Sequence, residues 1–232
     1  MLRQLFKKQR KCVIIDVNTQ KDFFLADGKA LVRNHRRVLA HIRRIMAWAR
    51  LKNVPVISTC EVYPEDHQRV NYCIAGTEGQ KKIRYALLNN RTSFPADDST
   101  DLPADILRQH SQVIFYKRSP DPFDEPRIER LLSEIRAGVF IVIGASTEGA
   151  VASTVLGLLQ RGKNVSVVVD AVGSRQKREA KLALRKMQAK GAKLIETRRL
   201  AGSSHLHAVG ICNCEMCHRH AKKAPPAVAT AC

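Results

Sequence analysis

Short apolar runs recur along the chain and alternate with longer amphipathic stretches. Runs of this length that alternate with helical patterns are typical of strands joined by right-handed crossovers. We therefore predict an α/β fold of three layers, in which a doubly wound, mostly parallel, Rossmann-like sheet of six strands lies between helices. The apolar runs lie at 12–16, 54–59, 112–116, 139–143, 165–169 and 193–196, and the helical patterns at about 30–51, 125–136, 147–161 and 175–190.

The alternation of apolar runs and helical patterns also indicates the domain organisation. This alternation stops near Leu200, and the chain ends in a stretch rich in alanine and proline at 224–231. We predict one folded domain at residues 1–200, followed by a Cys/His-rich and Ala/Pro-rich tail at 201–232. The segment between 60 and 112 has no clear pattern, and because long insertions in compact domains are often functional, we expect it to form a wall of the site.

The chain is strongly basic. It carries 40 Lys and Arg against 21 Asp and Glu, a net charge of +19, which raises the possibility of an anionic partner such as nucleic acid. Two groups of these cations fall on the polar sides of two helical patterns, and no aromatic residues interleave with them, so the sequence does not favour nucleic acid binding. A solvated helix face accounts for the same pattern.

Compartment and membrane contact follow from the apolar runs and the cysteines. No run is long enough to span a bilayer, and the basic N-terminus lacks a signal-peptide core. We expect a cytoplasmic protein with no membrane partner, in which the seven cysteines are reduced or bound to metal.

Candidate catalytic side chains stand at the ends of predicted strands. The carboxyl ends of parallel strands meet at one edge of a sheet, and ligands bind there near the point where the strand order reverses. Asp16 ends the first apolar run and Lys117 follows the third. A carboxylate and an ammonium at such a place can act as an acid/base pair, each holding the other in its charged form. For either residue alone, a solvated strand-end side chain is the alternative.

The turn at 144–151, with the sequence GASTEGAV, follows the fourth apolar run and opens a helical pattern. A strand–turn–helix of this kind directs backbone N–H groups at an anion or oxyanion, and we assign these donors to Thr147, Gly149 and Ala150. Ser146 or Thr147 is the expected N-cap of the helix. The position expected to carry the attacking side chain is Ala150, which has no nucleophile.

Taken together, the motifs resemble a known family. The order of a strand-end Asp, the sequence QKDF, the sequence CIAGTEG, a strand-end Lys and the 144–151 turn resembles the isochorismatase-like cysteine hydrolases, which include nicotinamidases and N-carbamoylsarcosine amidases. The resemblance covers residues 10–200. The motifs lie at 16, 20–23, 73–79, 117 and 144–151.

This resemblance implies an Asp/Lys/Cys triad. In that family the Cys thiolate attacks a carbonyl, the Asp relays its proton, the Lys stabilises charge, and a turn that often contains a non-proline cis peptide forms the oxyanion hole. Carried over by position, Lys117 is the lysine and Ala150 stands in the place of the cysteine. The resemblance therefore implies a hydrolase family member that is a pseudoenzyme for thiol chemistry, and it also implies a homo-oligomer.

Two residues compete for the position of the catalytic aspartate. The family spacing places it two residues before Gln20, at Asn18, whereas the hydrophobic pattern of the first strand ends at Asp16. We take Asp16 as the working base and keep Asn18 as the alternative register. If Asn18 holds the position, two of the three triad members are absent.

The metal question has separate answers for the domain and the tail. The segment 59–67 lacks the Asp-x-His spacing by which family members bind metal, so we expect the core domain to need no cofactor. In the tail, Cys212, Cys214, Cys217 and His218 offer three thiolates and an imidazole, enough for a tetrahedral zinc site. Reduced, unstructured cysteines and an iron–sulfur or haem site remain alternatives.

Three functional hypotheses follow. The first is an isochorismatase-family protein that lacks cysteine-nucleophile amidase activity and binds a small amide or carboxylate. The second is an active hydrolase of the nucleophile-independent, vinyl-ether type that uses Asp16 as acid and Lys117 as electrostatic support. The third is a basic scaffold that binds nucleic acid or a protein partner.

Overall fold

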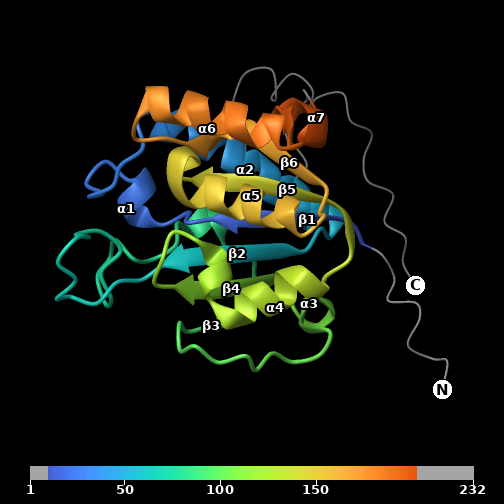
Figure 1. Cartoon of the computed structure of the whole chain (residues 1–232), viewed down its shortest axis with the longest axis horizontal. Helices are drawn as coiled ribbons and strands as arrows, with labels where there is room; N and C mark the ends of the chain where they lie inside the picture. Colours follow the sequence, from blue (N-terminus) through green and yellow to red (C-terminus); the bar gives the residue numbers. More distant parts are fainter. Residues whose placement is uncertain (1–9, 203–232) are drawn as a thin grey trace, which may run out of the picture.

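The computed structural model describes residues 10–202, and these form one parallel sheet with helices on both faces (Figure 1). The order of the strands is β3-β4-β2-β1-β5-β6-β7, and every pair is parallel. The predicted α/β class is thus confirmed, with seven strands in place of six. The strands are β1 (Arg10–Val17), β2 (Val56–Glu61), β3 (Arg91–Phe94), β4 (Gln112–Lys117), β5 (Ala137–Ala145), β6 (Val165–Gly173) and β7 (Lys193–Ile195).

The strand that the prediction omitted is β3, at one edge of the sheet. Its sequence Arg-Thr-Ser-Phe has no apolar run, and exposed positions alternate with half-buried ones along it. Edge strands pair on one side only, so they need less apolar surface than central strands do. Hydrophobicity alone therefore gives no signal for this element.

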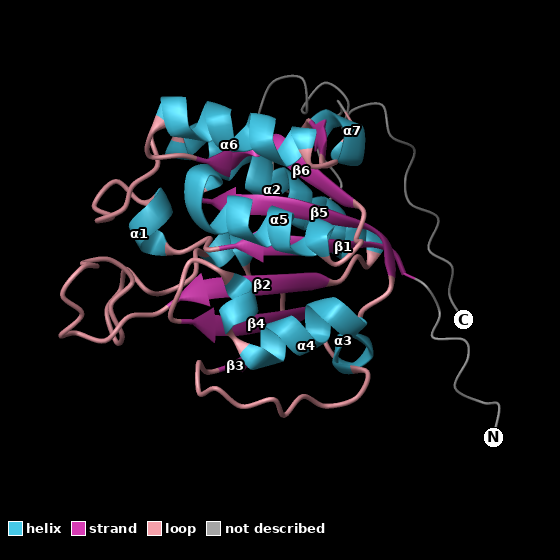
Figure 2. Cartoon of the chain, in the orientation of Figure 1, coloured by secondary structure: helices cyan, strands magenta, loops and turns pink. Residues whose placement is uncertain are grey.

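Helices cover the two faces of the sheet unequally (Figures 1 and 2). On one face, α2 packs against β6 and α7, whereas α4, α5 and α6 pack on the other face. The helical elements are α1 (Lys21–Phe24), α2 (His35–Lys52), the short turn η1 (Arg84–Ala86), α3 (Ile106–Gln109), the short turn η2 (Pro122–Asp124), α4 (Pro126–Glu134), the single π-turn η3 (Thr147–Val151), α5 (Ala152–Gln160), α6 (Lys177–Ala189) and α7 (Thr197–Ala201).

The central strand β1 shows which side chains belong to which face. Val13, Ile15 and Val17 pack in the core under α4 and α5, and Ile14 packs in the core under α2. Successive side chains of a strand point to opposite faces of the sheet. Asp16 therefore lies on the α2 face, and this placement decides its partners.

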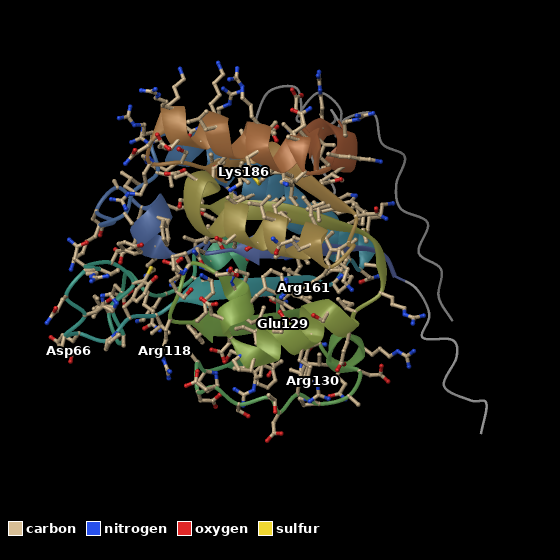
Figure 3. All side chains as sticks on the ribbon, viewed as in Figure 1. Asp66, Arg118, Glu129, Arg130, Arg161 and Lys186 are labelled. Atoms are coloured by element: carbon tan, nitrogen blue, oxygen red, sulfur yellow. The ribbon has the colours of Figure 1, made fainter. Side chains whose placement is uncertain are left out.

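The outer surface of α6 carries the basic face that the sequence predicts. Its side chains extend away from the sheet (Figure 3), and Lys181, Arg185 and Lys186 are exposed. Beneath it, Arg161 at the end of α5 pairs with Glu129 of α4 and ties these two helices together. No helix in the described part of the chain is long and apolar enough to cross a membrane.

Candidate functional site

The centre of the candidate site is a cluster of three buried polar side chains at the carboxyl ends of β1, β2 and β4. The Asn18 Nδ2 atom donates to Glu61 Oε1 at 2.7 Å, and the Lys117 Nζ atom donates to the same oxygen at 3.2 Å. The exposed fractions are 0% for Asn18, 2% for Glu61 and 1% for Lys117. We call these three residues the Asn18 cluster.

Lys117 is fully occupied within the protein. Besides Glu61, its ammonium donates to the carbonyls of Ser119 at 2.6 Å and Pro120 at 3.1 Å. An ammonium has three protons, so these three acceptors use all of them. Burial lowers the pKa of Lys117, and the Glu61 carboxylate opposes that effect.

Asp16 belongs to a second buried cluster. Its Oδ2 atom accepts from Lys82 Nζ at 2.7 Å, from Ser58 Oγ at 2.9 Å and from Thr19 Oγ1 at 3.1 Å. Burial is the largest single influence on the pKa of Lys82 and lowers it, but the charge and hydrogen bond of Asp16, together with Cys60 and Tyr116, raise this pKa overall. Asp16 and Lys82 thus form a buried ion pair on the α2 face.

The acid/base pair expected between Asp16 and Lys117 is not what the structure contains. Asp16 follows Ile14 onto the α2 face, whereas Lys117 follows Val113 and Phe115 onto the face under α4. Lys82 takes the place expected for Lys117 beside Asp16. Side chains alternate between the two faces along each strand, and a hydrophobic run does not tell which face the last residue of a strand takes. The sequence therefore could not show that Asp16 and Lys117 lie on opposite faces.

Asn18 reaches the Lys117 side because it breaks the strand alternation. Its φ is 47°, a left-handed conformation that asparagine tolerates better than most residues. The Asn18 register, which the motif spacing favours, is the one that places a residue from the carboxyl end of β1 beside Lys117, since Asn18 directly follows β1. Asp16, taken as the working base, lies with Lys82 instead.

The turn at 144–151 has the strand–turn–helix form that the sequence predicts. The peptide bond between Ala145 and Ser146 is cis, and η3 and α5 follow it. Gly144 has a φ of 119°, and a Cβ there would lie 1.8 Å from the Val17 carbonyl oxygen, so only glycine fits. Ala150 is 2% exposed and packs in the core under α5.

Backbone and side-chain groups of this turn are partly committed to internal bonds. The Gly149 N–H donates to the Ser146 carbonyl at 3.1 Å, so it points into the turn and away from the predicted oxyanion role. Thr147 Oγ1 donates to the Gly173 carbonyl at 2.9 Å, and Ser146 occupies the N-cap position without a side-chain hydrogen bond. Ser146 thus holds the expected N-cap position, but its side chain does not make the capping hydrogen bond. Glu148 Oε1 accepts from the Arg175 N–H and holds the turn against the loop after β6.

The two loop motifs serve to shape the site. Gln20 donates to the Glu61 carbonyl at 2.7 Å and accepts from the Glu61 N–H at 2.9 Å, which fixes the end of β2. Asp22 accepts from the Cys73 N–H at 2.6 Å. A Cβ on Gly79 would lie 2.2 Å from the Asp22 carboxylate, which explains a glycine at that place.

Sequence reasoning missed Glu61 and Lys82 as members of the two clusters. Glu61 ends an apolar strand as Asp16 and Lys117 do, and this position was a usable signal. Lys82 lies in the patternless segment 60–112, and it reaches Asp16 because Gln20 and Lys82 form an antiparallel bridge. No local pattern predicts that pairing.

Within residues 10–202, no three His, Cys, Asp or Glu side chains form a group that could hold a metal ion. The proposed zinc ligands of the tail, Cys212, Cys214, Cys217 and His218, lie outside the described residues.

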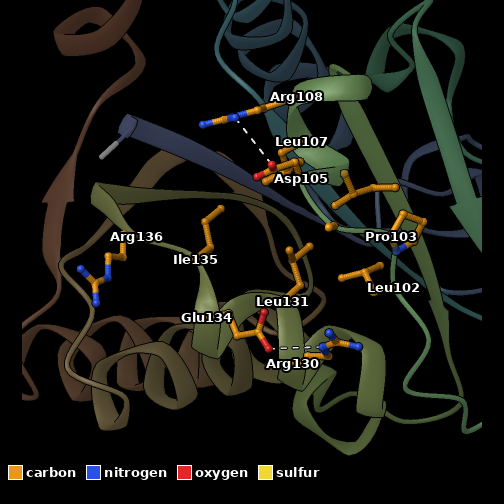
Figure 4. Close-up of a pocket in the computed structure, with 12 residues that line it drawn as sticks. Leu102, Pro103, Asp105, Leu107, Arg108, Arg130, Leu131, Glu134, Ile135 and Arg136 are labelled. Carbon is orange, nitrogen blue, oxygen red and sulfur yellow. Dashed lines mark hydrogen bonds and ion pairs between the residues drawn. The ribbon is translucent and has the colours of Figure 1, made fainter. Parts of the chain in front are cut away.

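A separate hollow lies at the opposite edge of the sheet. It has a volume of about 260 Å3 between α3 and α4, and two ion pairs, Asp105 with Arg108 and Arg130 with Glu134, stand on its walls (Figure 4). Its lining residues precede β4 and β5 in the chain, so it lies at the amino ends of these strands. It is therefore separate from the Asn18 cluster.

Comparison with known proteins places the chain in a family. The sequence model of the isochorismatase domain matches residues 12–199. The chain belongs to the isochorismatase family. No curated protein sequence matches it.

Several solved structures share the fold. A pyrazinamidase of Pyrococcus horikoshii in complex with zinc is 20% identical, with a TM-score of 0.64, and covers 80% of this chain and 99% of its own. A nicotinamidase of Bacillus subtilis is 17% identical, with a TM-score of 0.64 and coverages of 80% and 99%. The MAR1 ribonuclease of Caenorhabditis elegans is 20% identical, with a TM-score of 0.58, and covers 97% of this chain and 96% of its own.

Proposed function

We propose that this isochorismatase-family protein does not carry out cysteine-dependent hydrolysis and instead binds a small amide at the Asn18 cluster. The observation that carries the proposal is the state of Lys117, whose three ammonium protons go to Glu61, Ser119 and Pro120. A lysine so occupied does not stabilise a developing charge on a substrate without first losing one of these bonds. Ala150 adds that no thiol is present.

With Ala150 in the place of the cysteine and Asn18 in the place of the aspartate, the site lacks both the attacking thiol and the base that would accept its proton. Nucleophilic catalysis needs an adjacent base to activate the attacking atom. An asparagine amide does not act as a base at neutral pH, and Asn18 already donates its Nδ2 hydrogen to Glu61. The proposal therefore assigns binding to this cluster and no covalent step.

The type of ligand follows from the atoms that have no partner. Asn18 Oδ1 and Glu61 Oε2 are buried acceptors without a hydrogen bond in the described structure. A buried unpaired acceptor is costly, so a ligand that donates N–H groups gains from meeting them. A primary amide supplies such donors, and its carbonyl oxygen suits the backbone N–H groups of Thr147 and Ala150. Because Glu61 neutralises Lys117, an amide fits better than a carboxylate.

Nicotinamide and pyrazinamide are suitable probes, since they are the amides named by two of the structural neighbours. We expect the protein to release no ammonia from either, and calorimetry to detect binding that Asn18→Leu abolishes. Asn71→Leu, at an exposed position, is the matched control and should bind as the parent does. Ammonia release by the parent protein would refute the proposal. We expect Ala150→Cys to remain inactive, because it restores neither the base nor a free lysine.

The nucleophile-independent alternative has less support. It requires Asp16 to give a proton while Lys117 supports the charge. Asp16 accepts three hydrogen bonds on Oδ2, which is the role of a carboxylate, and Lys117 lies with Glu61. An Asp16→Asn variant that abolished a measured hydrolase activity would revive this alternative.

A nucleic-acid-directed function is the second candidate. The structural neighbour described as a ribonuclease covers 97% of this chain, and the net charge of +19 suits a phosphate backbone. The test is binding to single-stranded RNA over a range of salt. Affinity should fall steeply as salt rises, because bound cations displace counterions from the phosphates. An affinity indifferent to salt would count against this candidate.

A further inference from the structure

A groove of about 700 Å3 runs beside β3 and β4 on the α2 face of the sheet. Its lining includes five cationic side chains and no acidic one. We call it the basic groove. Its cations are Lys21, Lys81, Lys82, Arg84 and Arg91, and Tyr116 lies among them.

Local carboxylates neutralise only part of this charge. Glu78 pairs with both Lys21 and Lys81, and Asp16 pairs with the buried Lys82. Within the described residues, neither Arg84 nor Arg91 has a carboxylate partner, and both are exposed. The groove therefore keeps a positive charge that an anionic ligand can meet.

The wall of the groove is held in place before any ligand binds. The buried Gln112 side chain accepts from the Leu88 N–H at 2.7 Å and donates to the Ala86 carbonyl at 2.8 Å. Arg91 Nη1 donates to the Leu88 carbonyl at 2.8 Å. A preformed wall reduces the entropy lost when a ligand binds.

Aromatic rings accompany the cations. Tyr116 is half-buried in the lining. Tyr85 is not itself a lining residue, but it follows the lining residue Arg84 in η1 and is 49% exposed. The Arg43 guanidinium lies 4.2 Å from the centre of the Tyr85 ring. The sequence shows no interleaving of aromatic and basic residues, but the fold brings them together. Proteins that bind single strands combine such rings, on which bases stack, with cations that follow the backbone.

We propose that the basic groove binds the phosphodiester backbone of a single-stranded nucleic acid. This inference rests on the second candidate function and gives it a place on the molecule. The cations come from three separate segments, at 21, 81–84 and 91, and they line one groove. A series of phosphates meets such an arrangement better than one isolated phosphate does.

The experiment compares two variants with the same change of charge. Arg84→Glu/Arg91→Glu reverses two groove cations, and Lys181→Glu/Arg185→Glu reverses two exposed cations on α6, which packs on the other face of the sheet. Binding of a fluorescent RNA of about 12 nucleotides is measured by anisotropy from about 50 to 200 mM salt. Circular dichroism confirms that each variant is folded, and the matching Gln variants replace any that is not.

We expect the groove variant to lose at least about tenfold in affinity and the α6 variant to lose less than about threefold. The slope of log affinity against log salt should become shallower by about 1.4 in the groove variant, since each lost phosphate contact removes about 0.7. Inorganic phosphate and poly-glutamate, added at the same total charge as the RNA, should compete only weakly with the RNA for binding.

The possible failures are distinguishable. If the parent protein does not bind RNA, the second candidate function fails and this inference fails with it. If both variants lose affinity equally, the chain binds RNA through diffuse charge and only the basic groove is refuted. Displacement of RNA by inorganic phosphate or by poly-glutamate at equal charge would also overturn the inference, in favour of a small phosphate ligand or an acidic protein.

Discussion

Asn18 and Lys117 bind the same oxygen atom, Oε1 of Glu61, at 2.7 and 3.2 Å. One carboxylate thus stands between the two side chains that the motif spacing assigns to the family triad. Its negative charge is balanced by the lysine alone, because the asparagine is neutral. This balance leads to the first prediction.

Asn18→Asp should destabilise the protein at pH 7. The new carboxyl would adjoin Glu61, and like charges raise the pKa of one of them in the folded state. A raised folded pKa means that stability is kept below the unfolded value of about 3.9 and is lost as the pH rises through the folded value. We expect a loss of about 2 kcal/mol at pH 7 and less at pH 4, measured by urea unfolding. Asn18→Ser, which adds no charge, should show a loss that does not depend on pH; an equal loss at both pH values in Asn18→Asp would contradict the argument.

Removing Lys82 should be among the most damaging single changes. It leaves the buried Asp16 carboxylate without its ion-pair partner, and such losses are about 3–5 kcal/mol. Lys82→Met should therefore lower the free energy of unfolding by that amount. Asp16→Asn/Lys82→Met should be more stable than Lys82→Met alone, since no buried charge remains. If the double variant is the less stable of the two, the ion pair is not the source of the loss.

Gly79→Ala should distort the contact between the two loop motifs. The added Cβ would lie 2.2 Å from Asp22 Oδ2, and we expect a loss of about 2–3 kcal/mol. In an Asp22→Ala background the same change should cost less by about 1 kcal/mol or more, because the clashing carboxylate is gone. If the effects of Gly79→Ala and Asp22→Ala on the free energy of unfolding are strictly additive, the added Cβ does not clash with the Asp22 carboxylate.

Cys60 should make the protein less stable in alkali. Burial, the largest cause, raises the pKa of its thiol to about 11 from 9.0. The unfolded chain therefore ionises first, and the free energy of unfolding should fall between pH 9 and pH 11, by about 2–3 kcal/mol from this group.

The raised pKa of Lys82 acts in the same direction, so the contribution of Cys60 is the difference from Cys60→Ala. That variant should show a smaller loss over the same pH window. In the native parent protein, Cys60 should also resist alkylation at pH 8. Rapid alkylation under native conditions would contradict the predicted burial.

The fold could be predicted from the sequence because its central strands are buried on both faces. The apolar runs at 12–16 and 139–143 became β1 and β5, which pair along their length. The edge strand β3 could not be found in this way, since its Arg-Thr-Ser-Phe sequence is half exposed. Apolar runs report burial, whereas β3 pairs with β4 along its backbone and only alternate side chains, Thr92 and Phe94, are half-buried.

The site was predictable only in part. The ends of apolar runs identify Asp16 and Lys117 as buried strand-end residues, but which residues face each other depends on register between strands. Glu61 pairs with Lys117 because β2 and β4 are aligned there, and Lys82 reaches Asp16 from a distant loop. Neither relationship leaves a trace in local periodicity.

The Gln112 side chain has a consequence for how the molecule opens. Besides Leu88 and Ala86, it donates to Ser58 Oγ at 2.8 Å, and Ser58 donates to Asp16. The segment that forms the groove wall is thereby joined to the central strands by buried bonds. Its amide hydrogens should exchange with solvent only when the sheet itself unfolds, so the wall behaves as part of the slowest-exchanging unit and not as a surface loop.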